Sequence, residues 1–160
     1  HFILTSHTPQ SLLPTIMSRV EHIAVKKITN EQSQRILIDR GIADTATLQQ
    51  ILFLASGLPA ELSRLSADTA YFADQASSVR RARDFLSGTM YARLVIAARI
   101  TSRADAVAFV QMLARLVQFG VTQRRMTIHP TRANMLETVA ARLEANGHIK
   151  TQLLFLAVSL

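Results

Sequence analysis

Residues 102–117 read SRADAVAFVQMLARLV and have the pattern of a long helix buried on one side. Ser102 and Asp105 stand three residues apart, which is a capping-box-like start for a helix. Apolar side chains then recur every three or four residues and cover one broad face: Val107, Val110, Met112, Leu113, Leu116 and Val117. The stretch therefore predicts a central helix packed against other helices.

Helix start and stop signals also follow one another through residues 29–67. Thr29 has a glutamine three residues later, which is the spacing of a capping box. Asp44 predicts the cap of a second helix that ends at Gly57, and Pro59 suits the first turn of a third. We expect a small bundle of three short helices here.

Longer helices are expected in the remaining sequence. The apolar spacing predicts them over 71–86, with a break at Ser77 and Ser78, over 89–100, and after Pro130 and Gly147. Together with the central helix they form a second and larger bundle. The predicted fold class is therefore all-α, with a small three-helix bundle followed by a larger helical domain.

The N-terminal residues have a different pattern. Residues 2–5, Phe-Ile-Leu-Thr, form a β-rich run, and a loop marked by Pro9 and Pro14 follows. A lone strand is unstable, and nothing downstream is a convincing partner for it, so we expect its sheet to lie upstream of His1. A second apolar run at residues 23–28 is interrupted by two lysines, which indicates either another strand or an extended linker.

The composition excludes several kinds of site. The chain has 160 residues and no cysteine, which excludes disulfides, thiolate metal sites and cysteine nucleophiles. Its five histidines lack zinc-ligand spacing, its glycines form no phosphate loop, and its acidic residues are too dispersed for a catalytic pair. We expect no metal, no cofactor and no enzyme activity in this chain. The longest apolar run is too short to span a membrane, so we expect a cytoplasmic protein.

Positive charge is concentrated in the second half of the chain. Residues 1–79 have a net charge of −1, and residues 80–160 have a net charge of +8. This asymmetry indicates two modules, and the basic one faces nucleic acid, an acidic partner or only solvent. Arg80, Arg81 and Arg83 are candidate contacts with DNA phosphate or with a partner subunit. Few aromatic residues accompany them, which favours the subunit.

Residues 8–20, TPQSLLPTIMSRV, are similar to a known family. With the preceding strand, they resemble the sensor 1 and SRC region of AAA+ clamp-loader subunits in the order of strand, proline turn and Ser18-Arg19 pair. Val20 stands where that family has a cysteine. The end of the chain resembles the last collar helix of the bacterial delta-prime subunit. The resemblance implies three parts: the end of an AAA+ core over 1–28, a helical lid over 29–75 and a helical collar for oligomerisation over 76–160.

The resemblance also implies roles for individual residues. Arg19, with Ser18 beside it, would be an arginine finger that reaches the ATP of a neighbouring subunit. Such a guanidinium stabilises the charge that develops on the transferred phosphoryl group. Ser6 falls near the polar sensor 1 position of the family, with Thr5 and His7 as alternatives.

The second sensor of the family is altered in this sequence. Active ATPases of the family begin the third lid helix with Gly-Ser-x-Arg, whereas residues 57–60 read GLPA. Arg64, one turn later, is a poor substitute. The resemblance therefore implies a delta-prime-like subunit of the bacterial DNA polymerase III clamp loader, which offers a finger without hydrolysing ATP itself. A gamma/tau ATPase subunit is the alternative within the family.

The implied partners are the other clamp-loader subunits, the sliding clamp and primer-template DNA. ATP and Mg²⁺ would be bound by the parent complex, which loads the clamp on primed DNA. An interpretation outside the family is a free-standing basic helical module that binds nucleic acid or serves as an adaptor.

Overall fold

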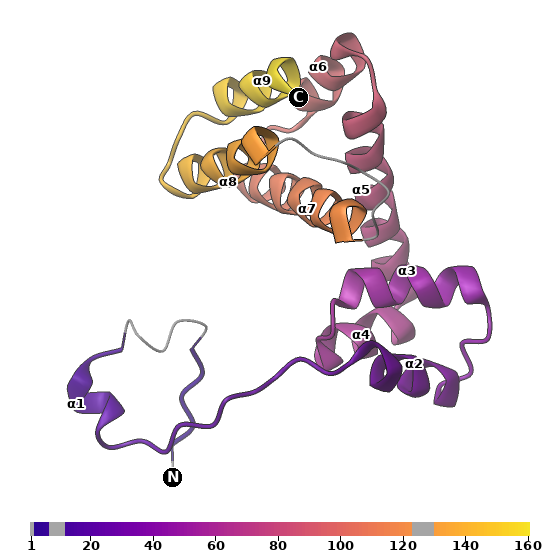
Figure 1. Ribbon diagram of the computed structural model, residues 1–160, viewed down its shortest axis with the longest axis vertical. Helices are drawn as coiled ribbons and strands as arrows, with labels where there is room; N and C mark the ends of the chain where they lie inside the picture. Colours follow the sequence, from indigo (N-terminus) through magenta and orange to yellow (C-terminus); the bar gives the residue numbers. More distant parts are fainter. Residues whose placement is uncertain (1, 7–11, 123–129) are drawn as a thin grey trace.

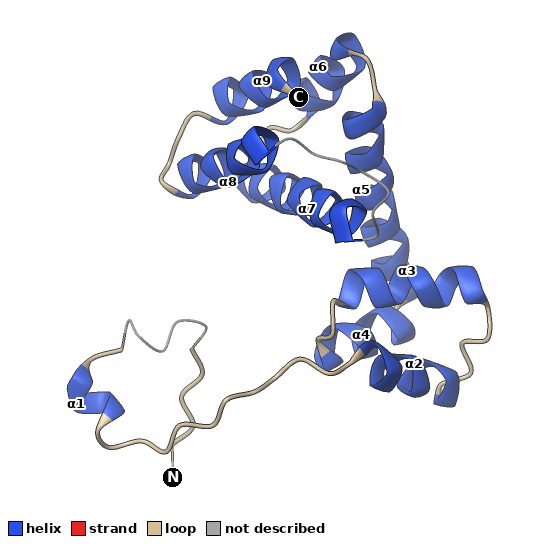
Figure 2. Cartoon of the chain, in the orientation of Figure 1, coloured by secondary structure: helices blue, strands red, loops and turns tan. Residues whose placement is uncertain are grey.

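The structure, a computed structural model, describes three ranges of the chain, without the side chains of residues 130–132: 2–6, 12–122 and 130–160. Within these ranges the chain forms helices and no strand, which confirms the all-α prediction (Figure 2). The helices are α1 Pro14–Met17, α2 Asn30–Asp39, α3 Thr45–Ala55, α4 Pro59–Ala67, α5 Thr69–Ser87, α6 Met90–Arg99, α7 Arg103–Thr122, α8 Pro130–Glu144 and α9 Ile149–Ser159. The parts of the sequence predictions that lie outside the described ranges are His1, His7, His129 and the first four residues of the 8–20 motif, 8–11 with Pro9 among them.

Helices α2, α3 and α4 pack together as the predicted small bundle (Figure 1). Thr29 forms the predicted capping box, in which its Oγ1 accepts from the backbone N–H of Gln32 at 3.2 Å and its own N–H donates to the Gln32 Oε1 at 3.0 Å. Asp44 caps α3 by accepting from the backbone N–H and the hydroxyl of Thr47. These bonds stabilise the carboxylate, so the pKa of Asp44 lies below its usual value.

Helices α5 to α9 form the second, larger group, and α5 runs from the first group into it (Figure 1). The predicted break at Ser77 and Ser78 was wrong, because α5 is continuous through both. The Ser77 hydroxyl donates to the carbonyl of Asp74 at 2.8 Å, within the preceding turn, and so does not draw the backbone out of the helix. The domain boundary expected after residue 75 falls inside this helix.

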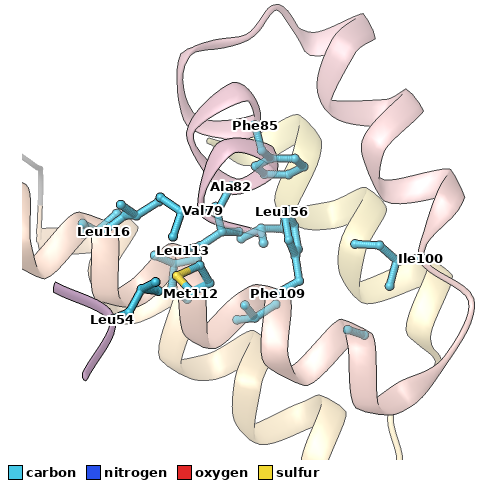
Figure 3. Close-up of a cluster of buried hydrophobic side chains, with 14 of the residues drawn as sticks. Leu54, Val79, Ala82, Phe85, Ile100, Phe109, Met112, Leu113, Leu116 and Leu156 are labelled. Atoms are coloured by element: carbon cyan, nitrogen blue, oxygen red, sulfur yellow. The ribbon is translucent and has the colours of Figure 1, made fainter. Parts of the chain in front are cut away.

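The core is centred on α7, as the sequence predicted. Five of the six predicted side chains are buried, Val107 is half-buried, and the Phe109 ring is an additional core member. Figure 3 shows Phe109 and Phe85 among the buried side chains of this core, and their rings meet edge to face with centroids 5.2 Å apart. Such a pair is a favourable aromatic arrangement. One cluster of buried apolar residues extends from Leu37 in the first group to Ala157 in the second.

The N-terminal β-rich run is part of no sheet among the described residues, which agrees with the expectation that a lone strand is unstable. Residues 2–6 form no strand, and the Phe2 side chain is fully exposed. A strand is stable only beside another strand, and the described residues contain none. Pro14 opens the short helix α1 instead of lying in a loop, since proline suits the first helical position. Two alternatives were predicted for residues 23–28, a strand or an extended linker, and the structure has the linker.

The linker joins the first bundle at Gly57. The Ile28 N–H donates to the Gly57 carbonyl at 3.0 Å, and Gly57 has a φ of +78°. A Cβ added at Gly57 would lie 2.8 Å from the Ile28 carbonyl oxygen. We expect Gly57→Ala to lower the free energy of unfolding by about 1–3 kcal/mol in urea denaturation, because the left-handed backbone and the close contact both oppose a side chain.

Gly41→Ala is the matched control. Gly41 has a similar φ of +82°, but a Cβ there would meet nothing within 4 Å. It therefore carries the backbone strain without the contact. Equal losses in the two variants would contradict the close approach of the linker to Gly57.

Candidate functional site

Arg19 and Ser18 lie at the end of α1, and both side chains are exposed. The Arg19 Nη1 donates to the carbonyl of Thr15 at 2.9 Å, and the Ser18 hydroxyl donates to the same carbonyl at 3.2 Å. The other N–H groups of the Arg19 guanidinium make no hydrogen bond with the described residues. This leaves most of the guanidinium accessible to an anion from outside the chain. Ser6 is also exposed, in the N-terminal segment.

The start of α4 carries no arginine, and Arg64 is engaged elsewhere. Its guanidinium carbon lies 3.7 Å from the centre of the Tyr71 ring on α5, a cation–π contact. The Tyr71 hydroxyl donates to the Glu61 Oε1 at 2.7 Å. This hydrogen bond, together with partial burial and the charge of Glu61, raises the pKa of Tyr71 above its usual value. Arg64 therefore stabilises the packing of α4 against α5.

The three predicted arginines of α5 are all exposed, but they do not lie at one site. Arg80 and Arg83 line a groove between α3, α5 and α7. Arg81 is not part of this lining, and its Nη2 donates to the Ser78 hydroxyl at 3.5 Å. Arg81 therefore lies on a different side of α5 from Arg80 and Arg83, although the three arginines are neighbours in the sequence.

The groove has a volume of about 630 Å³. Two phenylalanines from distant parts of the sequence lie in it, Phe53 of α3 and Phe119 of α7, with ring centroids 5.2 Å apart and planes at 75°. Gln49 and Gln50 line it from α3. Arg115 stabilises the packing of two helices that line the groove. Its Nη1 donates to the Leu54 carbonyl at 3.0 Å and so links α7 to the last turn of α3.

The groove was not predictable from the sequence. The lining residues are separated by tens of positions, and only the packing of α3, α5 and α7 brings them together. The one sequence signal was the basic cluster of α5. The guanidinium groups of Arg80 and Arg83 make no hydrogen bond and no ion pair with another described residue, so two positive side chains one turn apart have no ion-pair partner in the described part of the chain.

Residues 153–158 of the last helix are apolar on every side of the helix, whereas Lys150 and Thr151 in its first turn are exposed polar residues. The buried residues of this helix are Leu153, Leu156 and Ala157. Three of its outward side chains are also apolar, with exposed fractions of 43% for Leu154, 46% for Phe155 and 62% for Val158. We call these three residues the α9 surface. A helix that is apolar all round is normally covered by other protein on all sides.

Two other features concern possible ligands and membranes. Among the described residues, no three histidine or acidic side chains are grouped so that they could hold a metal ion. Helix α7 is long and apolar enough to cross a membrane by length and composition alone. The core helix of a water-soluble bundle has the same properties, and α7 supplies eight buried residues to the core.

Compared with models of protein families, with curated proteins and with solved structures, the chain matches none.

Proposed function

We propose that the chain is the C-terminal part of a delta-prime-like subunit of the bacterial DNA polymerase III clamp loader. In this proposal, α5 to α9 join the other loader subunits in a ring, and Arg19 enters the ATP site of a neighbouring subunit. The ring loads the sliding clamp on primed DNA in the cytoplasm. ATP and Mg²⁺ belong to the neighbouring sites, and this chain itself hydrolyses nothing.

The observation that carries the proposal is the order of elements along the chain. An exposed Ser18-Arg19 pair ends a short helix, an extended linker follows, and a three-helix bundle comes next. A second helical group then ends in a helix that is apolar on every side over residues 153–158. This is the order of core, lid and collar that the sequence resemblance implies.

The α9 surface supports a role in assembly. Leu154, Phe155 and Val158 expose apolar area to solvent on a helix whose opposite side is already in the core. Burying such area in a partner is favourable, and contiguous exposed apolar patches mark interaction sites in soluble proteins. In a ring of subunits this surface would face a neighbour.

The gamma/tau alternative is less well supported. An ATPase of that kind needs an arginine at the start of α4 that reaches its own ATP. Ala60 stands there, and Arg64 is stacked on Tyr71. A free-standing adaptor or nucleic-acid-binding module is the remaining alternative, in which Ser18 and Arg19 are ordinary surface residues.

Assembly provides the test of the proposal. The chain is mixed with the other clamp-loader subunits of the same organism, and complexes are measured by size-exclusion chromatography with light scattering. We expect the wild-type chain to join the complex. Phe155→Asp should weaken its incorporation at least tenfold, which corresponds to about 1.4 kcal/mol, because a carboxylate would be buried against an apolar neighbour.

Ile38→Asp is the control variant. Ile38 is 57% exposed on α2, and the same substitution there places a charge on a different face. It should assemble like the wild type. A wild-type chain that does not join the loader subunits would overturn the proposal. Equal assembly of both variants would contradict a role of the α9 surface in assembly.

A further inference from the structure

We propose that the groove between α3, α5 and α7 is a binding site for a nucleotide unit, either free or within a single strand. The base would stack on the phenyl ring of Phe119, and the phosphate would lie on Arg80 and Arg83. This inference does not rest on the clamp-loader proposal, because it uses only the side chains that line the groove.

The phosphate half of the site is the pair of arginines. Arg80 and Arg83 are three residues apart on α5, so their side chains leave the same face of the helix. Two like charges at this spacing repel each other, and no described carboxylate forms an ion pair with either guanidinium. A phosphate relieves this repulsion, and the planar guanidinium fork can donate to two of its oxygens at once.

The base half of the site is aromatic and amide. Phe119 is 45% exposed although it contacts the Phe53 ring, so part of its surface is open to a second flat group. Bases stack on such rings with little regard to sequence. Gln49 and Gln50 add carboxamides that make no hydrogen bond with other described residues. Each presents a donor and an acceptor, which matches the edge of a base.

A nucleotide accounts for the whole groove better than an acidic peptide does. The lining joins cations, carboxamides and an aromatic ring in about 630 Å³, within the usual size of small-ligand sites. A nucleotide carries a flat ring, polar edges and an anion in one covalent unit. A peptide would need an acidic and an aromatic side chain at the right spacing to satisfy the same groups.

Fluorescence anisotropy with the full chain tests the site. The probes are a labelled oligothymidylate of about ten nucleotides, a length in the range of known single-strand sites, and an abasic strand of the same length. We expect the oligothymidylate to bind at least tenfold more tightly than the abasic strand. Unlabelled thymidine monophosphate that displaces the strand would assign the site to free nucleotides, and failure to displace it would assign the site to the strand.

Matched variants locate the binding. Arg83→Gln should weaken oligothymidylate binding at least tenfold, whereas Arg81→Gln makes the same change of charge outside the groove and should weaken it less than twofold. Phe119→Leu keeps an apolar contact with Phe53 but removes the stacking surface. It should weaken binding of the oligothymidylate and leave that of the abasic strand unchanged.

Three outcomes would overturn the proposal. Equal weakening by Arg81→Gln and Arg83→Gln would mean a diffuse basic face. Equal binding of the abasic strand and the oligothymidylate would mean contacts with phosphate alone. Displacement of the strand by an acidic peptide containing phenylalanine, at lower concentration than thymidine monophosphate, would assign the groove to a protein partner. Circular dichroism of each variant checks that the helices are retained.

Discussion

Replacing Phe85 by alanine should lower the free energy of unfolding by about 3–5 kcal/mol. The Phe85 side chain is completely buried, and its ring meets the edge-to-face partner Phe109 at 5.2 Å. Alanine would leave a cavity where α5 and α7 pack together, and the Phe109 ring would lose that partner. Because a domain of this size is stabilised by about 5–15 kcal/mol in total, the loss is a large fraction of the stability. Chemical denaturation followed by circular dichroism measures it.

Phe155→Ala is the control for this prediction. It deletes the same atoms from a side chain that is 46% exposed on α9, so the expected loss is less than about 1.5 kcal/mol. If Phe85→Ala leaves no folded protein, Phe85→Leu retains most of the volume and gives a measurable midpoint. Equal losses at Phe85 and Phe155 would contradict the packing of α5 against α7.

The helix boundaries could be predicted because their causes are local. Thr29, Asp44 and Thr89 each accept a hydrogen bond from the backbone N–H three residues later, and Ser102 does the same for Asp105. A cap of this kind involves only one turn of chain, so the sequence contains everything that determines it. The apolar face of α7 was predictable for a similar reason, because its spacing follows the period of a single helix.

The contacts between helices could not be predicted in the same way. Arg93 donates from Nε to the Phe85 carbonyl at 2.9 Å and so binds α6 to the end of α5. Arg103 donates from Nη1 to the carbonyls of Leu143 and Gly147, about forty residues away in the sequence. As sequence these arginines only add to the basic charge of the second half. Their roles depend on which carbonyls are left open at helix ends that the tertiary packing brings near.

The same limit applies to the candidate sites. Arg19 was identified because a short contiguous motif surrounds it, and the structure shows that its side chain is exposed. The groove has no such motif. Phe53 and Phe119 meet only because α3 and α7 approach each other, and the amphipathic pattern of either helix alone assigns its phenylalanine to a core.

Under the clamp-loader proposal, Arg19→Ala should separate stability from catalysis when the subunit is assembled with its partner subunits. Arg19 is exposed, and the one hydrogen bond that its guanidinium makes with the described residues goes to Thr15 in the adjacent short helix, so stability should change by no more than about 0.5 kcal/mol. An arginine finger instead stabilises the transition state of its neighbour's reaction. At the ATP site that faces Arg19, turnover should fall by about 10³–10⁵-fold, measured as phosphate release in the presence of primed DNA and clamp.

Arg64→Ala is the control for the prediction at Arg19. Arg64 is stacked on Tyr71 between α4 and α5, so its removal should cost a little stability and leave ATP turnover unchanged. If both variants hydrolyse ATP at the wild-type rate, Arg19 is a solvated surface residue and the adaptor interpretation gains support. If Arg19→Ala prevents the ring from forming, its contribution is to assembly. Only loss of turnover in an intact ring assigns Arg19 to the transition state, because an arginine that merely held subunits together would lower assembly and turnover in parallel.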